Sequence, residues 1–128
     1  MTYLLDTHSF LWLVWNDSRF SSIARAQIAV PGTQAYVSLA SVWEIAIKVG
    51  IGKLSLKRPV DEFFQLHLAS SGIDLLHPTL DDVLNVAKLP LHHRDPFDRL
   101  LISRSLTQNM PLISADTHFD SYGVQRVW

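Results

Sequence analysis

Short apolar runs alternate with helix-like segments along the chain, and this alternation is the strongest constraint on its fold. Apolar runs bounded by turn or capping residues predict five strands, over residues 3–5, 35–37, 73–77, 111–115 and 124–127. Strands separated by helices form βαβ units with right-handed crossovers. The sequence therefore predicts an α/β fold built around a central, mostly parallel five-stranded sheet.

The segments between these strands carry helix signals. We expect helices over residues 10–15, 22–30, 41–50, 59–70, 80–87 and 96–109. The spacing Ser41-x-x-Glu44 matches a capping box, in which the two side chains satisfy backbone amides at a helix start. Asp95 followed by proline matches an N-cap and a first helical position. Thr7 or Ser9 is expected to cap the helix over residues 10–15.

Length and composition limit the class of protein. The chain has 128 residues and a mass of 14.5 kDa, which predicts a single domain over residues 1–128. It contains no cysteine, which excludes disulfides and thiol catalysis. No apolar run approaches the ~20 residues of a membrane span, so we expect no membrane association. The start of the chain lacks the basic region of a signal peptide, so we expect a cytoplasmic protein.

Acidic residues recur where strands end and helices begin. Asp6 directly follows the first predicted strand and Asp116 the fourth, while Glu44 lies in the helix after the second strand. Asp95 and Asp98 open the helix that leads into the fourth strand. Ligands of open parallel sheets bind beyond the carboxyl ends of the strands. Because Mg²⁺ and Mn²⁺ prefer carboxylate oxygens, the pattern predicts a divalent metal site there.

Each of these acids also has a purely structural interpretation. Glu44 completes a capping box, Asp95 caps a helix, Asp98 favours a helix dipole, and Asp116 can cap the segment that follows it. Asp6 is harder to explain in this way. It lies deep in the predicted core, where an unpaired charge is costly, and this favours a functional role.

The order and spacing of the acids resemble those of PIN-domain nucleases. The resemblance rests on the stretches Leu4-Leu5-Asp6-Thr7, Trp43-Glu44, His93-Arg94-Asp95-Pro96-Phe97-Asp98-Arg99-Leu100-Leu101 and Ser114-Ala115-Asp116. The third stretch is the most specific, and it is similar to the VapC-type toxin ribonucleases of bacterial type II toxin–antitoxin systems. The resemblance covers the whole chain. It implies a PIN-like three-layer α/β/α fold with strand order 3-2-1-4-5.

The resemblance also implies a set of site residues. The acidic residues of the family correspond by position to Asp6, Glu44, Asp98 and Asp116. We expect Asp6 and Asp98 to be direct ligands of Mg²⁺, for which Mn²⁺ can substitute. Glu44 and Asp116 are expected to bind a second ion or to orient the attacking water. The supporting residues are Thr7, Ser114 and Asp95, of which Asp95 is expected to act first as a helix cap.

The implied activity is metal-dependent endonucleolytic cleavage of RNA. The net charge of −1 is not that of a globally basic nucleic-acid binder, but the chain becomes net positive once the four site acids are set apart. Candidate RNA contacts are His93, Arg94 and Arg99. The remaining histidines share no zinc-ligand spacing, so structural packing is expected for His8, His67, His77 and His118.

The expected protein partners are a second copy of the chain and a cognate antitoxin. Several large apolar residues are expected to lie outside so small a core; they are Trp12, Trp15, Trp43, Phe63, Phe64 and Leu66. Exposed apolar patches usually mark interfaces, and the resemblance implies a homodimer inhibited by an antitoxin that binds a hydrophobic groove near the acids.

Other functions are compatible with part of this pattern. A non-catalytic PIN-like interaction protein and a PIN nuclease of RNA processing without a toxin role both remain open. A haloacid-dehalogenase phosphatase needs a second aspartate two residues after the first, where this chain has His8. A receiver domain needs paired acids after the first strand and a lysine after the last, and the chain has neither.

Overall fold

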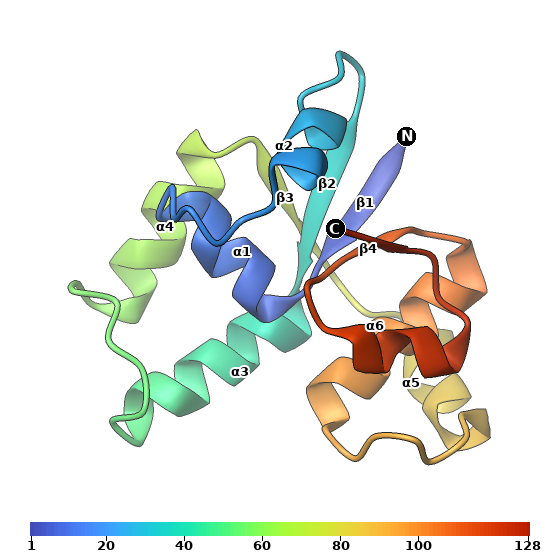
Figure 1. The fold of residues 1–128 in the computed structure, drawn as a ribbon. Helices are drawn as coiled ribbons and strands as arrows, with labels where there is room; N and C mark the ends of the chain where they lie inside the picture. Colours follow the sequence, from blue (N-terminus) through green and yellow to red (C-terminus); the bar gives the residue numbers. More distant parts are fainter.

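A central sheet organises the chain in the computed structural model, which describes all 128 residues (Figure 1). All neighbouring strands are parallel, and the order is β3-β2-β1-β4-β5, as predicted. The strands are β1 (Thr2–Leu5), β2 (Gln34–Ser38), β3 (Ile73–Leu76), β4 (Leu112–Ile113) and β5 (Arg126–Val127). The helices are α1 (Thr7–Val14), α2 (Ser22–Ile28), α3 (Leu39–Gly50), α4 (Val60–Ser70), α5 (Leu80–Asn85) and α6 (Pro96–Gln108), with 3₁₀ turns η1 (Val86–Lys88) and η2 (Thr117–Tyr122).

The side chains of β1 alternate between two helical layers, because successive strand residues point to opposite faces of a sheet. Leu5 is buried in a core that includes Phe10 of α1 and Phe63 of α4. Leu4 is buried on the other face in a smaller core that includes Leu101 of α6. The sheet is thus covered on both sides, which gives the predicted three-layer α/β/α architecture.

The strand register brings polar residues together at one edge of the sheet. Leu5 lies opposite Ile113 of β4, so the chain leaves both strands at the same level. The residues that follow are Asp6 and Ser114. This point lies between β1 and β4, where the strand order reverses, which is the position of ligand sites in open α/β sheets.

Two predicted helix starts are wrong. The first helix begins at Thr7, and its cap is Asp6, whose side chain accepts a hydrogen bond from the Ser9 amide. Helix α3 begins at Leu39 directly after β2, and Ser38 caps it by accepting from the Ala40 amide. The predicted capping box of Ser41 and Glu44 therefore does not exist, because the helix starts earlier and Glu44 lies in its interior.

The large apolar residues divide between core and surface. Phe63 and Phe64 are buried, so the sequence-based expectation that they lie outside the core is wrong. Trp43 is 63% exposed, in keeping with that expectation. No helix has the length and apolar character needed to cross a membrane.

Candidate metal centre

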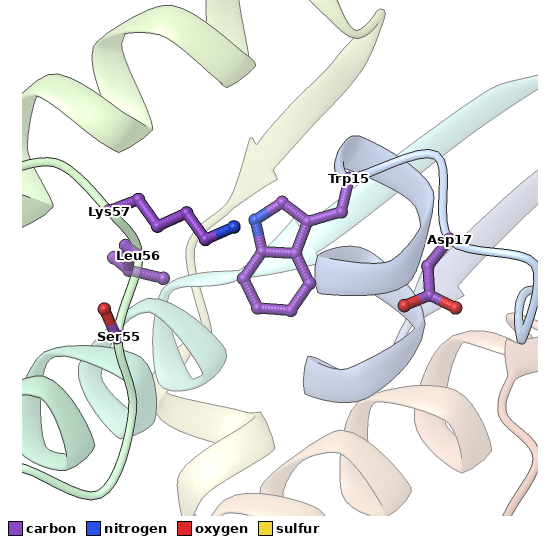
Figure 2. Close-up of a pocket in the computed structure, with 5 residues that line it drawn as sticks. All are labelled: Trp15, Asp17, Ser55, Leu56 and Lys57. Atoms are coloured by element: carbon purple, nitrogen blue, oxygen red, sulfur yellow. The ribbon is translucent and has the colours of Figure 1, made fainter.

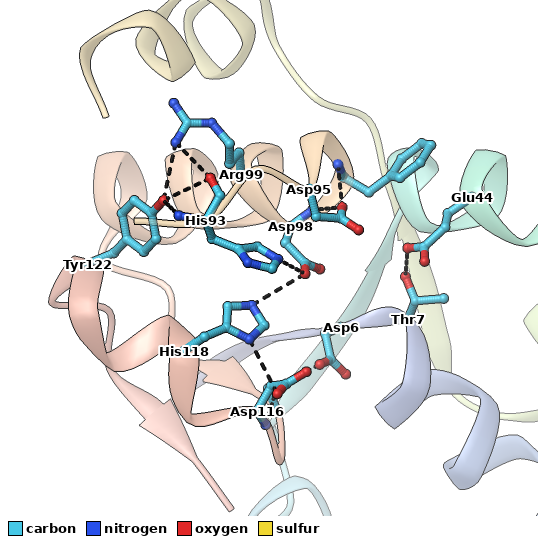
Figure 3. A network of polar contacts seen from close by, with 12 residues as sticks. Asp6, Thr7, Glu44, His93, Asp95, Asp98, Arg99, Asp116, His118 and Tyr122 are labelled. Atoms are coloured by element: carbon cyan, nitrogen blue, oxygen red, sulfur yellow. Dashed lines mark hydrogen bonds and ion pairs between the residues drawn. The ribbon is translucent and has the colours of Figure 1, made fainter. Parts of the chain in front are cut away.

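A polar cavity of about 330 Å³ lies at the carboxyl ends of β1 and β4, and no hydrophobic residue lines it. Its lining residues are Asp6, Thr7, His8, Glu44, Lys48, His93, Asp95, Asp98, Asp116 and His118. Figure 3 shows the four predicted acids converging from separate parts of the chain. The structure thus brings together Asp6, Glu44, Asp98 and Asp116, with Thr7, Asp95 and His93 beside them.

Asp6 is held in place from two sides. Its Oδ1 accepts a 2.8 Å hydrogen bond from the Ser9 amide, and its Oδ2 accepts a 2.6 Å hydrogen bond from the Ser114 hydroxyl. Only 6% of the residue is exposed, and this burial raises the pKa of the Asp6 carboxyl. Each carboxylate oxygen has two lone pairs, so both oxygens keep a further acceptor position. Ser114 thus helps to fix the orientation of the Asp6 carboxylate.

Glu44 enters the cavity from α3 and is also oriented by two partners. The Thr7 hydroxyl donates a 2.7 Å hydrogen bond to Oε1, and the Lys48 ammonium donates one of 2.7 Å to Oε2. Lys48 lies one turn further along the same helix, which is the spacing that lets the side chains meet. Glu44 is 6% exposed, so this ion pair offsets the cost of burying its charge.

Asp98 is under strong electrostatic pressure in the cavity. Burial, together with the nearby carboxylates of Asp95, Asp6, Glu44 and Asp116, raises its pKa to about 8. Carboxylates that crowd one another resist ionisation. A divalent cation among them removes that penalty, so this donor set suits a hard metal ion.

Two histidines complete the surroundings of Asp98. His93 Nε2 lies 3.2 Å and His118 Nε2 3.3 Å from Asp98 Oδ2, and the two rings stack with centroids 4.0 Å apart. His118 Nδ1 is also 3.3 Å from Asp116 Oδ1. The expectation of structural packing for His118 is therefore wrong. One potential ligand atom from each of His93, Asp98 and His118 lies within 4.8 Å of the others.

Asp95 caps α6 as predicted. Its Oδ1 accepts hydrogen bonds of 2.9 and 3.0 Å from the amides of Phe97 and Asp98. The same side chain also lines the cavity, and its negative charge raises the pKa of Asp98.

The arginines proposed as RNA contacts differ from each other. Arg99 donates hydrogen bonds to five acceptors, namely the backbone oxygens of Val86, Leu89, Pro90 and His93 and the hydroxyl of Tyr122. Its guanidinium is therefore occupied in holding the segment before α6, and its contact with RNA stays a prediction. Arg94 is exposed and has no hydrogen-bond or ion-pair partner in the protein.

Fold and cavity together define a parallel α/β domain with a carboxylate-lined site at the reversal of strand order. A family model described as the PIN domain matches residues 3–125. The chain belongs to the PIN domain family, whose members are nucleases. A search of curated protein sequences found no match.

Several solved structures share the fold over nearly the whole chain. VapBC2 from Rickettsia felis, bound to a DNA fragment from their promoter, has a TM-score of 0.73 at 13% identity, covering 99% of this chain and 98% of that one. VapBC-1 from nontypeable Haemophilus influenzae has a TM-score of 0.69 at 20% identity, covering 99% of this chain and 97% of that one. A toxin–antitoxin complex from Klebsiella pneumoniae has a TM-score of 0.64 at 17% identity, covering 98% of this chain and 96% of that one. At these identities the likeness is one of fold.

Proposed function

We propose that this protein is a metal-dependent endoribonuclease that acts as the toxin of a type II toxin–antitoxin pair. One observation carries the proposal: Asp6, Glu44, Asp98 and Asp116 come from four separate segments and line one cavity with no hydrophobic wall. A structural role for each acid alone does not explain why all four converge. Membership of the PIN family supports the same conclusion.

The donor set fits Mg²⁺, with Mn²⁺ able to substitute. Asp6 and Asp98 would hold the ion directly, and Glu44 and Asp116 would hold a second ion or orient a water. The raised pKa of Asp98 supports the fit, because crowding of carboxylates is the cost that a cation relieves. When bound, the metal lowers the pKa of a coordinated water and neutralises charge on the phosphodiester.

The residues of the chain supply position and proton exchange. Ser114 and the Ser9 amide fix both oxygens of Asp6, and Thr7 and Lys48 fix both oxygens of Glu44. Such fixed carboxylates need little reorganisation when charge develops on the substrate. His93 and His118 line the cavity beside Asp98, where an imidazole can contact a phosphate or give a proton to a leaving oxygen.

Protein partners are proposed on a separate observation. A separate apolar groove of about 340 Å³ is lined by Leu39, Ala40, Trp43, Pro78, Val83 and Leu100. Trp43 precedes Glu44 in α3, so the groove and the acidic cavity share a helix. The structural neighbours are toxin–antitoxin complexes, which supports an antitoxin partner for this chain. We propose that a second copy of the chain covers this groove in a symmetric dimer.

Cleavage assays test the activity. Asp98→Asn and Asp6→Asn each remove a ligand charge but keep the side-chain shape, so we expect a loss of at least 100-fold in Mg²⁺-dependent cleavage of single-stranded RNA with the fold retained. Full activity of Asp98→Asn would contradict the assignment.

Growth assays separate the toxin role from the alternatives. Expression of the wild type should slow growth, co-expression with the product of the neighbouring gene should restore it, and Asp98→Asn should have no effect. Cleavage without growth inhibition would favour a nuclease of RNA processing. Absence of both cleavage and divalent-metal binding would favour a non-catalytic interaction protein.

A further inference from the structure

Two further hollows are linked to the acidic cavity by shared lining residues. A hollow of about 420 Å³ shares Thr7, His8 and Lys48 with the metal centre. A third hollow, of about 370 Å³, shares Trp15 with the second and ends at Lys57 (Figure 2). We call the second and third hollows together the Trp12–Trp15 groove. The Trp12–Trp15 groove and the acidic cavity are thus neighbours that share Thr7, His8 and Lys48.

Aromatic rings and cations alternate in this groove. Trp12 lies on α1, and Trp15, about one turn later, is the C-cap residue of that helix. Trp15 is 38% exposed. The Arg19 guanidinium lies over the Trp12 ring, 5.1 Å from its centroid. Lys53 lines the second hollow, and in Figure 2 the Lys57 side chain extends toward the Trp15 indole. Stacking platforms interleaved with cations are the usual means of binding single-stranded nucleic acid without sequence preference.

Only some of the cationic side chains in the groove form ion pairs with acids of the protein. Arg19 is paired with Asp17 at 2.8 Å, and Lys48 with Glu44 at 2.7 Å. Lys53 and Lys57 are exposed and form no ion pair. Two cations are thus free to contact phosphates. The apolar groove beside Trp43, on the other hand, is lined by no charged residue and suits a protein surface.

From these observations we infer that the Trp12–Trp15 groove binds the part of a single-stranded RNA that lies beside the scissile bond. The inference rests on the proposed nuclease function, because it extends the path of a substrate whose reacting phosphate lies at the acids. Without a metal the acidic cavity repels phosphates, so the contacts that hold an RNA strand under these conditions have to come from its borders. Of the two grooves described here, this one carries cations and stacking faces.

Binding is tested apart from cleavage by fluorescence anisotropy with a labelled 12-nucleotide oligouridine in EDTA, at several salt concentrations. Each phosphate contact with a single strand contributes about 0.7 to the slope of log affinity against log salt. We expect Lys53→Ala with Lys57→Ala to lower the slope by about 1.4 and to weaken binding several-fold. The matched control is Lys88→Ala, an exposed lysine on η1 outside the groove, which should leave the slope unchanged.

The stacking contact has its own variant and its own probe. Trp15→Ala should weaken oligouridine binding roughly 5- to 100-fold, the range for loss of one stacked base, and wild-type tryptophan fluorescence should be quenched on binding. A duplex RNA of the same length should bind more weakly, because paired bases are not free to stack. The lysine variants keep the test valid if Trp15→Ala fails to fold, since both lysines are exposed.

The outcomes separate this inference from the proposed function. An unchanged slope in the double lysine variant, or equal binding of duplex and single strand, would overturn the inference even if the protein cuts RNA. The same holds if the double variant binds oligouridine normally but loses affinity for the antitoxin, which would make the groove a protein site. A reduced slope in a protein that cuts no RNA supports the groove and contradicts only the nuclease proposal.

Discussion

The hydroxyl of Ser114 donates a 2.6 Å hydrogen bond to the carboxylate of Asp6, across 108 residues of sequence and between two adjacent strand ends. Both side chains are buried. The bond exists because β1 and β4 are paired in a register that ends both strands at the same level. It links the fold to the metal centre directly, since a change in strand pairing would move one partner away from the other.

Ser114→Ala should therefore affect both stability and metal binding. Loss of this bond leaves a buried carboxylate with one partner fewer, which costs about 1–3 kcal/mol of unfolding free energy. The Ser114 hydroxyl also lowers the pKa of Asp6, so its removal raises that pKa and weakens Mn²⁺ binding at neutral pH. Thermal unfolding and calorimetric Mn²⁺ titration measure the two effects.

Ser103→Ala is the matched control for this prediction. Its hydroxyl is also buried, but it donates to the backbone oxygen of Asp82, away from the metal centre. This variant should lose stability without a change in Mn²⁺ affinity. Equal losses of Mn²⁺ affinity in the two serine variants would show that the effect of Ser114 is not specific to Asp6.

The metal-free protein should lose stability as the pH rises from about 4 to about 8. Asp98 has an ordinary pKa of 3.8 when unfolded and one of about 8 in the folded chain, so between these values the folded state holds a proton that the unfolded state has lost. Stability from this group is complete below the lower value and is lost as the pH passes through the higher one. Urea unfolding in EDTA at several pH values measures how the unfolding free energy changes with pH.

A saturating divalent metal should counteract this trend. Binding requires the ionised carboxylate, so at pH 7 it should release close to one proton from Asp98. Calorimetry in buffers of different ionisation enthalpy counts that proton, and Asp98→Asn should reduce both the release and the pH slope in EDTA; the pKa of Asp6 is also raised, so Asp6 contributes the remainder. His93 and His118 face the Asp98 carboxylate, so His93→Gln and His118→Gln are needed to assign the proton to Asp98.

Asp95→Asn should be a mild change with an informative pH effect. Asparagine caps helices about as well as aspartate, so the unfolding free energy should change by less than about 0.5 kcal/mol. The charge of Asp95 is the largest Coulombic contribution to the raised pKa of Asp98, so its loss should move the pH midpoint of Mn²⁺ binding downwards. Complete inactivation of this variant would instead make Asp95 a direct metal ligand.

The apolar groove should be covered in solution by a second copy. Val83 lines the groove and is 52% exposed, so Val83→Glu should convert a dimer into a monomer by placing a charge in the interface. Ile23→Glu is the matched control, because Ile23 is 59% exposed on α2 and does not line the groove. Light scattering at several concentrations measures the mass. A wild type that is monomeric at all concentrations would contradict the dimer.

The parallel sheet and the position of the acids at its carboxyl ends could be predicted from rules that act along the chain, whereas the strand order followed from the resemblance to PIN domains. Alternating strands and helices impose parallel pairing, and parallel pairing places residues after β1 and β4, such as Asp6 and Asp116, at one edge. The start of α3 was predicted wrongly because Ser38 and Ser41 are both good caps. Only the length of β2 decides between them.

The role of His118 had no comparable signal. It reaches Asp98 only because the 3₁₀ turn η2 places it against His93, and no spacing rule connects residues so far apart in the chain. The structural partners of Arg99 also had no signal in the sequence, for a related reason. Most of its acceptors are backbone oxygens of the loop over residues 86–93, and carbonyl groups are the same in every residue type.

The two arginines beside Asp98 should therefore respond differently to substitution. Arg99→Lys should lower the unfolding free energy by about 1–3 kcal/mol, because a compact ammonium cannot reach the separated acceptors that the planar guanidinium bridges. Arg94→Ala should leave stability unchanged and weaken RNA binding in EDTA, since this exposed side chain has no partner in the protein. Thermal unfolding of both variants measures stability, and fluorescence anisotropy in EDTA measures their RNA binding. If Arg99→Lys is as stable as the wild type and binds RNA more weakly, Arg99 contacts the substrate as the sequence first indicated.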